Sequence, residues 1–152
     1  MKTTPIRPGI AILGAAFLFL LSSPAYGERD VPYSVGEYGT EAYEVLEFQV
    51  KDNGRTEIYY SYGKTIKSVR LRYLGTDLHG HEACFKVQFP NKYILYVIPT
   101  GLSLKVVDDK GKYLKVFSWQ YEGPVDGRGT FCEVCAQSPE EAMRIVKNNF
   151  MK

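Results

Sequence analysis

Five side chains in this sequence are of the types that bind metals or carry out thiol chemistry. Cys132 and Cys135 are separated by two residues, and the third cysteine, Cys84, closely follows the two histidines, His79 and His81. A C-x-x-C pair can be a redox dithiol, half of a metal site, or part of a disulfide framework. Because the number of cysteines is odd, at least one must stay reduced, bind a metal or pair with another chain.

A metal site is one interpretation of this set. Cys84, Cys132 and Cys135 with either His79 or His81 would give the Cys3His ligands of a tetrahedral zinc site. A copper(I) ion also suits such soft ligands. The two histidines are expected in a polar turn and Cys84 further along a strand, so the loop would have to fold back. A Zn or Cu ion is therefore an alternative, and we expect no other cofactor.

Thiol–disulfide activity of Cys132 and Cys135 is a second alternative. A thioredoxin-like site places C-x-x-C at the start of a helix, where the helix dipole lowers the thiol pKa. Here the helix is expected to begin at Ser138, three residues after Cys135, and the strands before it are antiparallel. This arrangement gives the pair no helix-dipole support.

A disulfide among the three cysteines is the interpretation we favour. A bond from Cys84 to Cys132 or Cys135 would close a loop of about 50 residues and would typically contribute about 2–4 kcal/mol. It would tie the middle of the sheet to the segment before the helix. A bond between Cys132 and Cys135 is also possible and would close a small ring.

The first 27 residues have the features of a cleaved secretory signal peptide. Two basic residues precede the apolar run Ile10–Leu21, and the small residues Ala25 and Gly27 follow it. We predict cleavage before Glu28 and export to the periplasm or the cell exterior, where disulfides form. The apolar run is shorter than the roughly 20 residues that span a bilayer, so we expect no stable membrane anchor after cleavage.

The charge balance of the exported chain argues against nucleic acid as a partner. The signal holds two of the 19 Lys and Arg residues, which leaves 17 basic side chains against 17 acidic ones. Without a basic tract, there is no electrostatic footprint for a phosphate backbone. The sequence also lacks a G-x-S-x-G motif and a glycine-rich phosphate loop. We therefore favour a protein without catalytic activity.

Most of the exported chain shows the period-two pattern of β-strands. Leu46, Phe48 and Val50 alternate with polar residues, and an Asn-Gly turn follows. Seven strands are predicted in hairpin order, over residues 44–51, 55–62, 67–73, 81–89, 93–98, 102–107 and 112–119. The fold class expected is α+β, mainly β: a curved antiparallel sheet, either a sandwich- or a barrel-like meander. Residues 28–43 are expected as an extended arm or linker, and 44–152 as one domain.

A single amphipathic helix is predicted over residues 138–150. Ser138 can cap it, Pro139 suits the first turn, and Glu141 completes a capping box. Its apolar stripe comprises Ala142, Met143, Ile145, Val146 and Phe150. The apolar strand over 93–98 is the expected docking surface for this stripe.

The hairpin register bears on the reactivity of Cys84. A turn over residues 75–80 would place this outward-facing thiol opposite Arg70 or Arg72, which would lower its pKa. We consider it more plausible that these arginines pair with Glu82.

Aromatic residues suggest what the sheet could bind. Tyr59, Tyr60 and Tyr62 crowd one strand. Further aromatic residues follow at Tyr93, Tyr96, Tyr113, Phe117, Trp119 and Tyr121. Some would line a concave surface suited to an apolar ligand or a protein partner, although tyrosine also fits any half-buried strand. We therefore expect an exported binding or interaction module for an unknown protein or a small apolar ligand, stabilised by a disulfide through Cys84.

Overall fold

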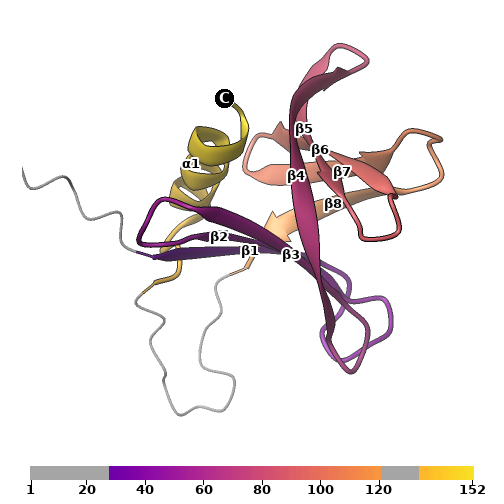
Figure 1. Cartoon of the computed structure of the whole chain (residues 1–152). Coiled ribbons are helices and arrows are strands. Elements are labelled where there is room, and N and C mark those ends of the chain that lie inside the picture. The colour runs from indigo at the N-terminus through magenta and orange to yellow at the C-terminus, as the bar shows by residue number, and fades with distance from the viewer. Residues whose placement is uncertain (1–27, 121–133) are drawn as a thin grey trace, which may run out of the picture.

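A computed structural model describes residues 28–120 and 134–152 as an eight-stranded barrel with one helix (Figure 1). The strands are β1 (Arg29–Val35), β2 (Glu44–Val50), β3 (Thr56–Tyr62), β4 (Lys67–His79), β5 (Glu82–Gln88), β6 (Ile94–Thr100), β7 (Ser103–Asp108) and β8 (Leu114–Trp119), and the helix is α1 (Pro139–Phe150). Each strand pairs antiparallel with the next, and β8 returns to β1. The predicted curved antiparallel meander with a C-terminal helix is confirmed, and it closes as a barrel.

The barrel closes through a short seam between β1 and β8. β1 pairs with β2 along its whole length. Its pairing with β8 is limited to Tyr33 with Trp119 and Ser34 with Ser118. A closed sheet has no free edge, which removes the usual template for aggregation. The seam must therefore be completed by other backbone groups.

Two further chain segments complete the seam. The Gln120 amide donates to the Pro32 carbonyl at 3.0 Å. Next, the Asp30 amide donates to the Val134 carbonyl at 2.8 Å, and the Ala136 amide donates to the Asp30 carbonyl at 3.1 Å. The edge of β1 is thus occupied first by the end of β8 and then by the residues that lead into α1.

The expectation that residues 28–43 form an arm or linker was wrong for 29–35. This stretch is β1, and its Val31 and Tyr33 side chains are fully buried in the core. Pro32 obscures the strand pattern, because proline cannot donate to a ladder. Pro32 is tolerated here because, on the side of β1 that faces β8, its carbonyl is the group that forms a hydrogen bond, accepting from the Gln120 amide.

The strand β4 replaces the turn expected over residues 75–80. It continues to His79, and its register shifts between Tyr73 and Gly75. Gly75 has a φ of 97°, a conformation that glycine adopts without strain. Such a bulge bends a strand without ending its pairing. The chain reverses only at Gly80.

The barrel interior is filled by side chains. Alternate residues of each strand point inward, and the largest of these that are fully buried are Tyr33, Phe48, Phe85 and Phe117, which Phe150 of α1 joins. Interiors of eight-stranded barrels are commonly just wide enough to be packed in this way. A ligand would therefore have to bind at an end of the barrel or on its surface.

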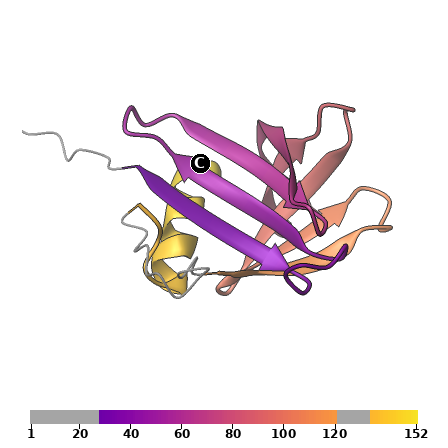
Figure 2. The same ribbon diagram turned by 90° about the horizontal axis from the view of Figure 1, so that it is seen from below.

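The helix α1 closes one end of the barrel (Figures 1 and 2). The Phe150 ring lies 5.3 Å from that of Phe48 and 5.4 Å from those of Tyr73 and Phe85, measured between centroids. The Tyr73 hydroxyl also donates to the Phe150 carbonyl at 2.8 Å. These contacts involve β2, β4 and β5, so the helix seals the barrel end instead of docking on residues 93–98.

The predicted start of the helix is confirmed. The Ser138 hydroxyl accepts a hydrogen bond from the Glu141 amide at 3.1 Å. The Glu141 carboxylate in turn accepts from the Gln137 amide at 2.8 Å, one residue before the position expected in a capping box. All five residues of the predicted apolar stripe are buried.

The predicted signal peptide, residues 1–27, lies outside the described residues and stays a prediction. Within residues 28–120 and 134–152, no helix is long and apolar enough to cross a membrane.

The loop after β1 gives a matched test of the fold. Gly36 and Gly39 have φ angles of 84° and 83°. A Cβ on Gly36 would lie 2.2 Å from the Ala42 carbonyl oxygen, whereas one on Gly39 would contact nothing within 4 Å. We expect Gly39→Ala to cost about 1–2 kcal/mol of unfolding free energy. Gly36→Ala should cost roughly 3 kcal/mol or more, because the backbone must also move. Urea denaturation of both variants measures the difference, and equal costs would contradict it.

Candidate ligand-binding site

The predicted metal ligands are not gathered at one place. His79 and His81 lie at the tip of the β4–β5 hairpin, and Cys84 lies on β5. Cys135 forms an isolated bridge to β1, which is on the opposite wall of the eight-stranded ring. Among residues 28–120 and 134–152, no three His, Cys, Asp or Glu side chains are placed to hold a metal ion. Cys132 lies outside the described residues.

Cys84 is a free and fully buried thiol. It packs with Ile98, Val107 and Tyr96 on the outer side of the barrel wall. The disulfide predicted through Cys84 is therefore not formed. In this position the Cys84 side chain contributes apolar packing.

The register of the β4–β5 hairpin explains the chemistry of this thiol. Cys84 lies opposite Asp77, and the arginine expected there, Arg72, pairs with Gln88 four residues further along β5. Burial, and then the Asp77 charge, raise the pKa of the Cys84 thiol. The predicted lowering of that pKa by arginine was wrong, because β4 continues past the expected turn.

Cys135 is disulfide-bonded and buried. Its backbone neighbours Val134 and Ala136 form the hydrogen bonds to β1 described above. The sulfur therefore belongs to the segment that connects the barrel seam to α1.

The end of the barrel opposite α1 contains an aromatic pocket of about 500 Å³, here called the mouth pocket. It is lined by Tyr60, Tyr62, Val69, Phe89, Pro90, Asn91, Tyr93, Leu95 and Tyr113. The residues come from β3, β4, the turn between β5 and β6, the start of β6, and the residues that precede β8. All of these positions are at the end of their strands that is remote from the helix.

The rings of the mouth pocket are packed against one another. Tyr60 stacks on Tyr62 with 5.6 Å between centroids, and its edge meets Phe89 at 5.1 Å. Phe89 in turn contacts Tyr93 at 5.9 Å. Strand alternation causes this arrangement, since Tyr60 and Tyr62 share the inward face of β3 with the core residue Ile58. The rings form a continuous wall that leads from the core to the rim.

A buried carboxylate, Glu44, lies beside this wall. It is the first residue of β2 and has the same inward orientation as Leu46. Only 7% of Glu44 is exposed. Its carboxylate accepts a hydrogen bond from the Tyr113 hydroxyl and forms an ion pair with Lys115. Such partners are needed to offset the cost of burying a charge.

A second buried carboxylate, Asp108, ends β7. One of its oxygens accepts from the amides of Lys112, at 2.9 Å, and Tyr113, at 3.2 Å. The other accepts from the Tyr93 hydroxyl at 3.0 Å. Burial alone would raise the pKa of Asp108, but these hydrogen bonds hold it below its usual value. Asp108 therefore fixes both the β7–β8 turn and one ring of the pocket.

The phenols of Tyr60, Tyr93 and Tyr113 stay neutral at physiological pH, because the pKa of each is raised. Burial and the Asp108 carboxylate raise the pKa of Tyr93 to about 12. Burial and the Glu44 carboxylate also raise the pKa values of Tyr60 and Tyr113. The Tyr93 and Tyr113 hydroxyls donate hydrogen bonds to these carboxylates and are not acid–base groups in this range.

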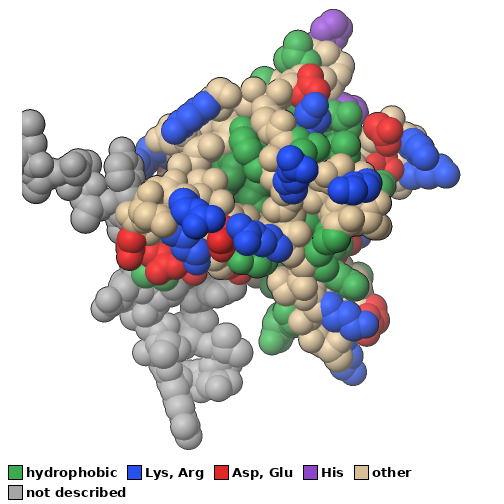
Figure 3. Space-filling view, viewed as in Figure 1, with side chains coloured by type: hydrophobic (Ala, Val, Ile, Leu, Met, Phe, Trp, Pro, Cys, Tyr) green, Lys and Arg blue, Asp and Glu red, His purple; other side chains and the backbone are tan. Residues whose placement is uncertain are grey.

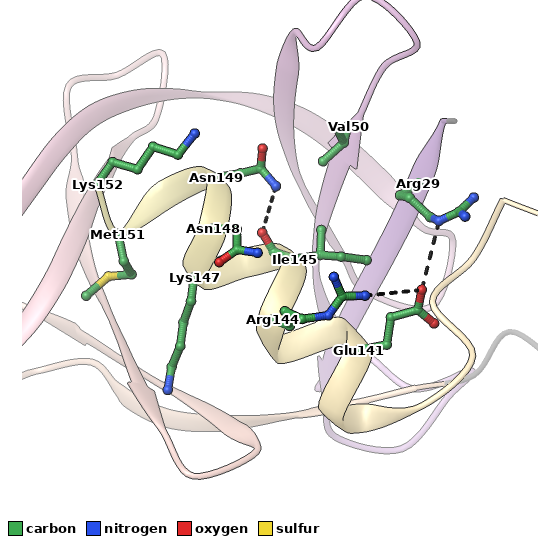
Figure 4. A pocket seen from close by; sticks show the side chains of 10 residues that line it. All are labelled: Arg29, Val50, Glu141, Arg144, Ile145, Lys147, Asn148, Asn149, Met151 and Lys152. Carbon is green, nitrogen blue, oxygen red and sulfur yellow. Dashed lines mark hydrogen bonds and ion pairs between the residues drawn. The ribbon is translucent and has the colours of Figure 1, made fainter. Parts of the chain in front are cut away.

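A larger groove, of about 670 Å³, lies along the outer side of α1 (Figure 4). Of the charged residues that line it, Arg29 and Arg144 both pair with the one acidic residue, Glu141. Glu141 lies 4.0 Å from Arg29 and 3.9 Å from Arg144, and the Asn149 amide donates to the Ile145 carbonyl at 2.8 Å. Figure 3 shows acidic and basic side chains interspersed on the face that it presents, without a large patch of one sign. The mouth pocket is therefore the better candidate site.

Comparison with known proteins assigns no family. No protein-family model, curated protein or solved structure matches this chain. The functional argument therefore rests on the geometry of the molecule.

The sequence pointed to the rings of this site but not to its charges. Tyr60, Tyr62, Tyr93 and Tyr113 were all among the aromatic residues singled out. Glu44 was not, although it begins the alternating inward series of β2. Glu44 could have been identified as a charged residue at a position where the period-two pattern of the strand predicts an apolar, inward-facing side chain.

The hydrogen bonds of Asp108 predict a pH-dependent stability. Because its pKa is lower in the folded protein, its contribution is present above the unfolded value of about 3.9 and is lost as pH falls through the folded value. We expect Asp108→Asn to cost about 1–3 kcal/mol at pH 7, since the amide nitrogen cannot accept from Tyr93. The variant should lose less stability between pH 5 and 2 than the wild type. Urea denaturation across this range measures both effects.

The exposed neighbour Asp109 provides the control. Asp109→Asn should leave both the stability and its pH profile nearly unchanged. A wild-type pH profile for Asp108→Asn would contradict the assignment.

Proposed function

We propose that this chain is an exported, non-enzymatic binding module whose mouth pocket takes a small apolar ligand. The observation that carries the proposal is a wall of packed aromatic rings at the open end of a barrel whose interior is filled. Rings of this kind offer flat apolar surface at a low entropic cost.

The dimensions of the mouth pocket support a small molecule. Its volume of about 500 Å³ lies within the range of roughly 300–1,000 Å³ usual for ligand sites. Tyr62 and Tyr93 are each 39% exposed, so a ligand would cover apolar ring surface that now faces water. A concave site favours a small ligand over a protein partner, which would need a broader surface.

A fluorescence titration tests this proposal. Tyr62→Ala removes an exposed ring from the mouth pocket and should weaken binding of the neutral dye N-phenyl-1-naphthylamine by about tenfold or more. Tyr38→Ala is the matched control, because Tyr38 is 68% exposed and does not line the pocket. Equal loss of affinity in both variants, or none in either, would place the dye elsewhere and contradict the proposal.

We also propose that Cys135 forms its disulfide with Cys132. Cys84 is free, so Cys132 is the remaining cysteine of the chain. The bond would constrain the segment that pairs with β1, and an exported protein meets conditions in which it forms. This pairing replaces the disulfide through Cys84 as the stabilising bridge.

Alkylation and mass spectrometry test the pairing. The oxidised protein without its signal should contain one free thiol, at Cys84. This thiol should resist iodoacetamide at neutral pH because it is buried and its pKa is raised. It should react once urea unfolds the protein, and peptide mapping should find Cys132 linked to Cys135. Three alkylated cysteines, or a bridge that includes Cys84, would contradict the pairing.

A further inference from the structure

The residues that line the mouth pocket provide no positive charge to bind an anion. None of the nine is basic. The Tyr93 hydroxyl is already donated to Asp108, and the Tyr113 hydroxyl to Glu44. The side-chain oxygen of Asn91 accepts from the Tyr93 amide at 3.0 Å. A negatively charged ligand would therefore find no positive charge in the lining, and only hydroxyl and amide donors beside ring faces and carboxylates.

The same arrangement favours a cation. The face of an aromatic ring carries a negative quadrupole, which attracts ammonium groups within about 6 Å. A phenol that donates to a carboxylate becomes more electron-rich, so the rings of Tyr93 and Tyr113 should attract a cation more strongly. Glu44 and Asp108 are 7% and 3% exposed, so their charges are poorly screened by water.

The protein already places one of its own cations in this environment. The Lys115 ammonium lies 5.3 Å from the centroid of the Tyr113 ring and is paired with Glu44. The Lys115 side chain is 37% exposed, so part of it faces solvent. Lys115 thus shows that a ring and a carboxylate at this end of the barrel hold an ammonium group together.

We infer that the ligand of the mouth pocket carries an ammonium or trimethylammonium group, held by the tyrosine rings with Glu44 behind them. This inference rests on the proposed function and adds a cationic group to the apolar body of its ligand. Glu44 and Asp108 together carry two negative charges, and Lys115 supplies one positive charge. A cationic ligand would balance the second negative charge, or would replace Lys115 as the ion-pair partner of Glu44.

Three probes that share a benzyl group test the charge preference. They are benzyltrimethylammonium, its uncharged isostere neopentylbenzene, and benzylsulfonate, each titrated into the full chain without its signal and followed by NMR. The cation should bind at least about tenfold more tightly than the isostere, and the sulfonate should bind most weakly. The shifts should centre on Tyr60, Tyr62 and Tyr93.

Two substitutions assign the preference to Glu44. Glu44→Gln should reduce affinity for the cation by about tenfold while leaving that for the isostere unchanged. Glu47→Gln is the matched control, because Glu47 lies on the opposite face of β2. If Glu44→Gln fails to fold, Lys115→Gln serves instead. It leaves Glu44 without its cation and should strengthen binding of benzyltrimethylammonium severalfold.

The outcomes separate this inference from the proposed function. Equal affinities for the three probes, or tighter binding of the sulfonate, would overturn the cationic ligand and leave an apolar binding site. Absence of binding by all three would overturn the binding site itself. Unchanged cation affinity in both Glu44→Gln and Lys115→Gln would overturn the role of Glu44.

Discussion

The structure depends on how the free edge of β1 is satisfied. A sheet of eight strands closes only if its first and last strands meet, and here they share two residue pairs. The remainder of the edge is taken by Gln120 and by residues 134–136, whose amides and carbonyls pair with Pro32 and Asp30. The segment that completes the seam also leads directly into α1. The segment that completes the barrel seam therefore also fixes where the chain enters the helix.

Because the helix covers one end of the barrel, the two ends differ in how far their aromatic rings are buried. At one end the helix inserts Phe150 among the rings of Phe48, Tyr73 and Phe85, and that end becomes part of the core. No second helix covers the opposite end within the part of the chain that the structure describes. Its rings are consequently half-exposed and surround a pocket. The asymmetry confines any small-ligand site within the barrel to the mouth, because the interior between the ends is packed.

Patterns local to a strand or helix were readable from the sequence, and those set by long-range pairing were not. The alternation of β2 and the cap at Ser138 depend on neighbouring residues, and both were predicted. β1 was missed because Pro32 hides a strand that long-range partners stabilise. The environment of Cys84 was misjudged because β4 continues to His79 and the chain reverses at Gly80, which places Cys84 opposite Asp77. Four of the five rings of the mouth pocket were among the aromatic residues singled out from the sequence, without Phe89, and their convergence required the closed barrel.

The carboxylate of Glu44 is the strongest sign that the mouth does more than end the barrel. A buried ion pair is weak evidence for stability, because an apolar pair of similar volume often stabilises a protein as well or better. Leu46 and Phe48 continue the same inward face and show that apolar residues fit this surface of β2. A charge at the first inward position therefore gives the core no advantage that an apolar residue could not supply. What it does supply is a fixed, poorly screened negative potential behind a wall of rings, which is the feature that the proposed cationic ligand would use.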